Sequence, residues 1–192
     1  MMEGKPPGAG RSSFDQIDRS IVFPALRLTG TTVFLDLGCG RGDYAIAAAE
    51  LIGPKGKVYG IDAWHPAIDE LRQTVERKGL RNVEAILSDA TERVPLPDRV
   101  ADVCLMAHVL HDFKREGGAE GVLKEAARVL KSSGILAIIE PKKVEAPYGP
   151  PLHVRLGSDE VEELIRPFGF LVTSLYDVAA FEYMVIASKD LS

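Results

Sequence analysis

An acidic residue followed by glycines at alternate positions is the stretch of this chain best suited to hold a ligand: Asp36, Gly38, Gly40 and Gly42. An apolar run, 32–35, leads into this stretch, and a helix-forming run, 44–51, leaves it. A glycine-rich turn between a strand and a helix lets a ligand approach the backbone closely, and the helix directs N–H groups toward that ligand. A dinucleotide fingerprint would place its third glycine where this chain has Asp43. The motif therefore predicts a ligand-binding turn and leaves the ligand open.

Two further carboxylates could face the same ligand, because Asp62 and Asp89 each follow an apolar run. In a doubly wound sheet, the carboxyl ends of neighbouring strands line one crevice. There, Asp62 can accept hydrogen bonds from ribose hydroxyls, and Asp89 can accept one from the amino group of a flat base. Ala90 would leave room for that base, and Trp64 is equally suited to pack on it or between helix and sheet.

The segment 107–113 carries a third group of polar side chains, which includes His108, His111 and Asp112. It follows an almost wholly apolar run, 101–107, which is typical of a strand covered on both faces. The segment should therefore face the crevice from the end of that strand. Histidine titrates near neutral pH and can take a proton from a hydroxyl group. A histidine here can also simply pack or cap a helix, so both roles of His111 stay open.

Strand and helix patterns alternate along most of the chain. The predicted strands are 32–35, 57–61, 83–87, 101–107, 134–139, 170–176 and 181–187, and the predicted helices are 14–28, 43–52, 66–78, 116–130 and 158–167. Strands separated by helices of about a dozen residues indicate right-handed crossovers and a parallel sheet. The link between the last two strands is too short for a helix, so these strands should form an antiparallel hairpin. The pattern predicts an α/β fold with a doubly wound, mostly parallel sheet of seven strands.

Composition narrows the classes of function. The chain has 192 residues, a formal net charge of −5 and 27% charged residues, which argues against a large nucleic-acid-binding face. Its two cysteines, Cys39 and Cys104, are too few for a disulfide framework and favour reduced thiols in the cytoplasm. We expect no signal peptide, no membrane span and no metal site. The oligomeric state stays open, and a homo-oligomer is compatible with the sequence.

The ordered motifs resemble those of the class I S-adenosylmethionine-dependent methyltransferases. The resemblance covers most of the chain and is closest to the small type 11 methyltransferase-domain proteins, which include the quinone-ring C-methyltransferases. One departure is Ser133, which stands where the family has the first of two glycines before the fifth strand. The matching segments are 36–42, Asp62, 88–90, 102–113 and 128–136.

The resemblance implies a Rossmann-like methyltransferase fold, S-adenosylmethionine as cofactor and S-adenosylhomocysteine as product. The carboxylate of Asp36 would favour the positive amino group and sulfonium of the cofactor. The implied cofactor-binding residues are Asp36, Gly38, Gly40, Gly42, Asp62, Ala63, Trp64, Asp89, Ala90 and Met106. In domain terms, we expect a flexible tail over 1–13 and a single methyltransferase domain over 14–192. Within it lie an N-terminal helical segment (14–30), a cofactor-binding core (31–140) and a substrate-side loop, helix and hairpin (141–192).

On the acceptor side, the segment 107–113 looks like the His-Asp step of plant-type O-methyltransferases, in which the histidine is a general base. The resemblance would make His111 the base and Asp112 its orienting neighbour. The loop 141–156 should help to build the acceptor pocket, with its His153 and Arg155 exposed to solvent. Phe14 and the N-terminal helix could close over the cofactor from the other side.

These features favour an enzyme that transfers a methyl group to a small-molecule acceptor whose identity the sequence leaves open. One alternative is a protein that binds S-adenosylmethionine without catalysis, as a regulatory or assembly subunit. Another is a nicotinamide-dependent oxidoreductase, against which Asp43 argues because it replaces the third fingerprint glycine.

Overall fold

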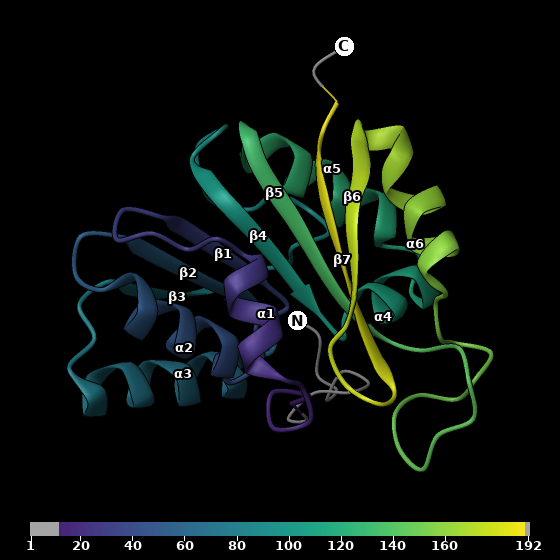
Figure 1. The fold of residues 1–192 in the computed structure, drawn as a ribbon. Helices are drawn as coiled ribbons and strands as arrows, with labels where there is room; N and C mark the ends of the chain where they lie inside the picture. Colours follow the sequence, from purple (N-terminus) through teal and green to yellow (C-terminus); the bar gives the residue numbers. More distant parts are fainter. Residues whose placement is uncertain (1–11, 191–192) are drawn as a thin grey trace.

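Seven strands form a single sheet with helices on both faces in the computed structural model, which describes residues 12–190 (Figure 1). The strands are β1 (Val33–Leu37), β2 (Lys57–Asp62), β3 (Val83–Leu87), β4 (Ala101–Ala107), β5 (Leu130–Pro141), β6 (Phe170–Asp177) and β7 (Glu182–Lys189). The helices are α1 (Arg19–Ala25), α2 (Asp43–Ile52), α3 (His65–Lys78), α4 (Leu110–Arg115), α5 (Ala119–Val129), α6 (Ser158–Ile165) and the 3-10 turn η1 (Arg166–Phe168). Most of the predicted tail, residues 1–11, lies outside the described residues.

The strand order is β3-β2-β1-β4-β5-β7-β6, with parallel pairing from β3 through β5. Strand β7 pairs antiparallel with both β5 and β6. The prediction of a mostly parallel doubly wound sheet with an antiparallel C-terminal hairpin is therefore confirmed. The chain winds outward in both directions from the β1–β4 boundary, and such a switch point opens a crevice at the carboxyl ends of the strands.

Alternating side chains of the central strands pack into two separate cores on opposite faces of the sheet. In β4, Val103 and Leu105 pack toward α1 and α2, whereas Cys104 and Met106 pack toward α5 and α6. All four side chains are buried, as a sheet covered on both faces requires. The strand ends are consequently held firmly, and the loops that follow them have fixed starting points.

Three predicted elements differ from the structure by more than small shifts of their ends. The helix predicted over 14–28 begins only at Arg19, because Asp18 caps it by accepting a hydrogen bond from the backbone N–H of Ser20. The helix predicted over 116–130 corresponds to α5, which begins only at Ala119, and α4 before it was not predicted; Gly117, with a φ of +80°, lies between the two helices. Strand β5 is longer than predicted at both ends.

Candidate active site

A cleft of about 920 Å³ opens at the carboxyl ends of the strands around the β1–β4 boundary. Most of the residues predicted to bind the ligand line it: Asp36, Gly38, Gly40, Asp62, Ala63, Trp64, Asp89, Ala90 and His111. Gly42 instead caps α2 and packs against Leu71, and Met106 is fully buried in the core on the α5 side. The turn and the three strand ends therefore meet as predicted, but Met106 has no surface in the cleft.

The glycine turn is fixed on one side and open on the other. Backbone N–H groups of Gly38 and Cys39 both donate to the carbonyl of Ile61, at 2.8 and 3.0 Å. A Cβ at Gly38 would lie 2.8 Å from Cγ1 of Val109, so a larger residue would collide there. At Gly40 the φ is +53°, yet apart from the two neighbouring residues in the chain no described atom lies within 4 Å of the position of a Cβ. The backbone at Gly40 is therefore the part of the turn that a ligand can approach.

Asp62 connects the end of β2 to this turn. Its Oδ2 accepts from the backbone N–H of Gly40 and its Oδ1 from that of Trp64, both at 2.8 Å. Burial raises the pKa of Asp62, while hydrogen bonds from Trp64, Gly40 and Ala63 act in the opposite direction. Because each carboxylate oxygen can accept a second hydrogen bond, the side chain keeps capacity for ligand hydroxyls.

Asp36 is a buried carboxylate with an unused oxygen. It is 1% exposed, and its Oδ2 has no hydrogen-bond partner among the described residues. Burial, together with the nearby charge of Asp62, raises the pKa of Asp36 to about 8. A positively charged ligand group placed here would lower that pKa and gain electrostatic stabilisation. The site therefore suits a cation.

The end of β3 supplies a small pocket wall. Oδ1 of Asp89 accepts from the backbone N–H of Thr91 at 2.9 Å and from its hydroxyl at 2.7 Å. This turn fixes the carboxylate and leaves Oδ2 available to a ligand donor. Ala90 beside it is buried and contributes little bulk.

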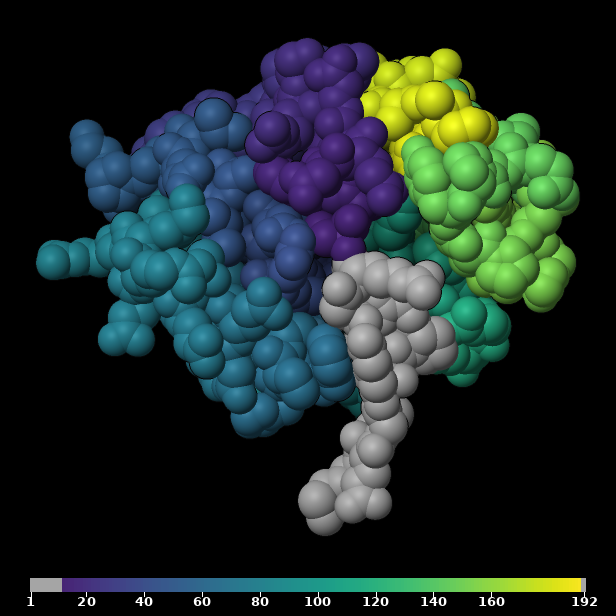
Figure 2. All heavy atoms as spheres, turned by 90° about the horizontal axis from the view of Figure 1, so that it is seen from below, coloured from purple at the N-terminus to yellow at the C-terminus, as the bar shows by residue number. Residues whose placement is uncertain are grey.

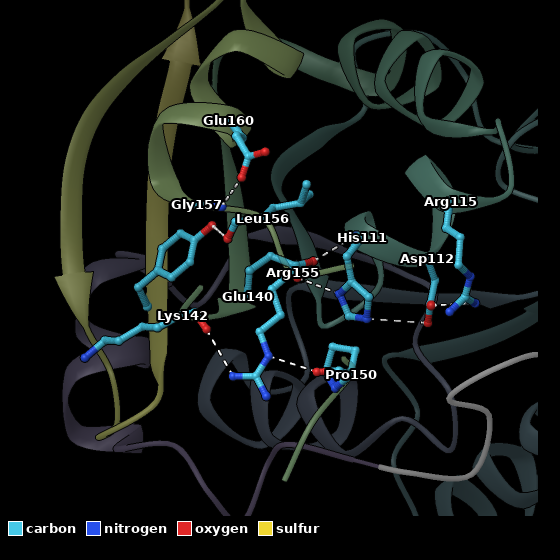
Figure 3. A network of polar contacts seen from close by, with 11 residues as sticks. His111, Asp112, Arg115, Glu140, Lys142, Pro150, Arg155, Leu156, Gly157 and Glu160 are labelled. Atoms are coloured by element: carbon cyan, nitrogen blue, oxygen red, sulfur yellow. Dashed lines mark hydrogen bonds and ion pairs between the residues drawn. The ribbon is translucent and has the colours of Figure 1, made fainter. Parts of the chain in front are cut away.

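A charged cluster at the start of α4 forms the opposite wall (Figure 3). Nδ1 of His111 lies 2.6 Å from Oε2 of Glu140, and the backbone N–H of His111 donates to Oε1 at 3.2 Å. The second ring nitrogen, Nε2, lies 3.7 Å from Oδ2 of Asp112, whose Oδ1 pairs with Arg115 at 2.8 Å. His111 is 5% exposed and Glu140 is fully buried.

The surroundings of His111 favour its protonated form. Burial lowers the pKa of His111, but the hydrogen bond and negative charge of Glu140, helped by Asp112, outweigh it and raise the pKa above its usual value. The ring is held by Glu140 through Nδ1, which leaves Nε2 as the nitrogen available for proton exchange. Glu140 was absent from the residues predicted to act here, although it follows the predicted strand 134–139 in the same way that Asp62 follows 57–61.

Two segments far apart in the sequence contribute to the lining of the cleft, and both lie on the face of the molecule seen in Figure 2. The segment before α1 contributes Ser12, Ser13 and Gln16, and the loop between β5 and α6 contributes residues 148–151. Phe14, predicted to cover the cofactor, instead packs edge-on against Tyr44 with ring centroids 5.1 Å apart. The N-terminal segment thus reaches the cleft through polar side chains.

Arg155 organises the loop between β5 and α6, contrary to the prediction that it is exposed. It is 4% exposed, and its guanidinium donates to four backbone carbonyls at 2.8–3.1 Å, those of Lys142, Val144, Tyr148 and Pro150. His153 is exposed as predicted. The loop is consequently a folded wall of the cleft, tied together from within (Figure 3).

Residues 12–190 contain neither a helix suited to a membrane nor a cluster of metal-binding side chains. None of their helices combines the length and apolar character needed to cross a bilayer. Within the same residues, His, Cys, Asp and Glu side chains form no group of three or more that could hold a metal ion.

Comparison with known proteins gives consistent matches. The family model described as "Methyltransferase domain" matches residues 28–181. A demethylmenaquinone methyltransferase of Geobacillus stearothermophilus is 38% identical over 106 residues, which are 55% of this chain and 44% of that protein. Aklanonic acid methyltransferase DauC of Streptomyces sp. (strain C5) is 33% identical over 132 residues, covering 69% of this chain and 58% of that protein. The chain thus spans about half the length of these curated relatives.

Among solved structures, the chain is similar to a SAM dependent methyltransferase from Aquifex aeolicus. The two are 30% identical and superpose with a TM-score of 0.83, over 95% of this chain and 93% of that one. The similarity therefore includes both the glycine-turn side of the sheet and the antiparallel side.

Proposed function

The chain belongs to the class I S-adenosylmethionine-dependent methyltransferases, and from this premise we propose that it methylates a small organic acceptor through an ionisable hydroxyl group. Two relatives are named for demethylmenaquinone and aklanonic acid, which supports a small-molecule acceptor. The cleft volume of about 920 Å³ is also in the range of small-molecule sites, roughly 300–1,000 Å³.

We propose that the glycine-turn side of the cleft holds the cofactor. The unpaired oxygen of Asp36 fits a cationic group, and the open backbone at Gly40 fits the methionine part. Asp62 would hold the ribose hydroxyls, while Asp89, Ala90 and Trp64 would receive the adenine. When bound, S-adenosylmethionine supplies an electrophilic methyl group and is converted to S-adenosylhomocysteine.

The buried His111–Glu140 pair supports catalysis rather than cofactor binding alone. We propose that Nε2 of His111 accepts the proton of the acceptor hydroxyl as the oxygen becomes a nucleophile. Glu140 fixes the ring through the 2.6 Å contact with Nδ1 and stabilises the imidazolium that forms. Asp112, held by Arg115, lies on the Nε2 side and adds to this stabilisation. The walls of the cleft would hold the reacting groups next to one another.

The test combines binding and turnover. Calorimetry should detect S-adenosylmethionine binding to the wild type and to His111→Asn with similar affinity. Formation of S-adenosylhomocysteine, measured with a panel of hydroxylated aromatic and aliphatic compounds, should require His111. Cofactor binding with no turnover on any acceptor would favour the non-catalytic alternative, and full turnover by His111→Asn would exclude the base.

A further inference from the structure

His108 has an unusual backbone for a residue that lines the cleft. Its φ is +56°, in the left-handed region, where a side chain is disfavoured. Among the described residues, the other non-glycine positions with positive φ are Arg27 and Arg99, both exposed and absent from the cleft lining. Strained backbone at a ligand site commonly holds a side chain in a required position.

The neighbours of His108 keep this conformation in place. Its backbone N–H donates to the carbonyl of Ile139 at 2.8 Å, which extends the β4–β5 pairing by one residue. The next residue, Val109, packs where a Cβ on Gly38 would have to lie. His108 is thereby fixed at the β1–β4 switch point, between the glycine turn and His111.

The imidazole of His108 has no polar partner among residues 12–190. No hydrogen bond to either ring nitrogen occurs within the described part of the chain, and Nε2 is buried without a partner. A buried polar group without a partner is costly, so such groups in native structures call for an explanation. His111, three residues later, has both nitrogens facing carboxylates.

The ring is also uncharged at physiological pH. Burial, followed by the nearby charges of His111 and Arg155, lowers the pKa of His108 to about 3. A neutral imidazole offers one N–H donor and one acceptor nitrogen. It can therefore bind an uncharged hydroxyl or carbonyl beside a sulfonium without repelling that cation.

We propose that His108 is a specificity-determining residue that hydrogen-bonds an oxygen of the acceptor next to the hydroxyl served by His111. This role rests on the proposed methyl transfer and defines the acceptor class more narrowly, as a flat ring compound with oxygen atoms on adjacent positions. The nearby walls fit such a ring, because Phe113, Tyr148 and Pro150 also line the cleft. His108 would select the acceptor, and His111 would take its proton.

Two variants separate the ring nitrogens from the ring shape. His108→Phe keeps a planar ring and removes both nitrogens, whereas His108→Asn restores polar atoms and tolerates the left-handed backbone. His153→Phe is the matched control, since His153 is exposed and absent from the cleft lining. Thermal unfolding and S-adenosylhomocysteine binding report whether each variant folds with an intact cofactor side.

The probes are 2,3-dihydroxynaphthalene, with two adjacent oxygens, and 2-naphthol, with one. Wild type and His153→Phe should prefer the dihydroxy compound in kcat/KM by about tenfold, the effect of one hydrogen bond to a buried group. His108→Phe should lose this preference because kcat/KM falls for the dihydroxy compound and stays the same for 2-naphthol. His108→Asn should recover part of the preference. A preference unchanged in a folded His108→Phe would overturn the role, although methyl transfer itself would stand.

A second measurement needs no turnover and no variant that might fail to fold. In protein loaded with S-adenosylhomocysteine, nitrogen NMR of the histidine rings should show a neutral His108 whose signals shift on addition of 2,3-dihydroxynaphthalene and far less with 2-naphthol. The proposed contact would be refuted if the His108 signals shift with neither compound. It would also be refuted if the dihydroxy compound does not bind. Loss of turnover with these shifts retained would instead count against the function of His111.

Discussion

Replacing Glu140 by glutamine keeps the shape of the side chain and removes its charge from the ring of His111. The contact to be weakened is short, 2.6 Å between Nδ1 and Oε2, and both side chains are shielded from water. A charge-assisted hydrogen bond is roughly twice as strong as a neutral one. The substitution should therefore cost about 1.5 kcal/mol of imidazolium stabilisation, which corresponds to about a tenfold lower kcat.

The pH profile of Glu140→Gln tests the direction of the expected change as well as its magnitude. The base must be neutral to accept a proton, so kcat/KM should rise with pH through the pKa of His111. In the wild type, Glu140 and Asp112 hold that pKa above its usual value despite the opposing effect of burial. Glu140→Gln removes the main stabilising charge, so the midpoint of the rise should move to lower pH while the plateau falls.

The assay is release of S-adenosylhomocysteine across pH at saturating cofactor, with any acceptor that the wild type methylates. Glu125→Gln is the matched control, because Glu125 is also a buried acid in a 2.6 Å ion pair, with Arg128, but lies outside the cleft. It should change stability and leave the midpoint in place. A midpoint in Glu140→Gln identical to that of the wild type would refute the proposed effect of Glu140 on His111.

Three other predictions concern the cofactor side and the loop. Gly38→Ala should destabilise the protein more than Gly40→Ala in urea unfolding, because only the Cβ at Gly38 meets Val109, at 2.8 Å; overpacking adds about 1–3 kcal/mol. Asp36 keeps its proton up to about pH 8 when folded and only to about 3.8 when unfolded, so this residue makes stability fall as pH rises between these values. Asp36→Asn should abolish that fall in urea titrations, and it should also abolish the proton release that accompanies S-adenosylmethionine binding near pH 7 in calorimetry with buffers of different ionisation enthalpy. Arg155→Lys should speed hydrogen exchange in the loop and raise KM for the acceptor, with unchanged cofactor affinity. The reason is that an ammonium group cannot reproduce the guanidinium geometry that reaches four carbonyls. Equal exchange rates in the variant and the wild type would contradict this.

Local patterns were enough to predict that the carboxylates at the strand ends share one cleft. Asp36, Asp62 and Asp89 each stand at or just after a strand end, so the rule that parallel strands end at one edge was enough to bring them together. The same rule applies to Glu140, near the end of β5. The partner of Glu140, His111, lies 29 residues away in the chain. The two residues meet through the β4–β5 register, and no local motif encodes that pairing.

The acceptor side depends on contacts that sequence patterns do not show. Arg155 lies in a loop rich in proline and glycine, which reads as exposed. It is buried because the backbone carbonyls of that same loop need donors. The left-handed backbone of His108 is equally hidden, since no local sequence pattern indicates a positive φ at a histidine. The side chain of Met106 enters the core on the α5 side and not the cleft, which its place near a strand end did not reveal.

The position of β7 in the sheet has a consequence for how the protein forms on the ribosome. Strand β7 follows every other strand in the chain, yet it lies between β5 and β6. Chains emerge from their N-terminal end, so β6 is made before its one neighbour in the sheet exists. Glu140 pairs in register with Tyr183 of β7, whereas the glycine turn and Asp62 depend on strands completed much earlier. A nascent chain can therefore complete the glycine turn and the end of β2 well before β7 pairs beside Glu140.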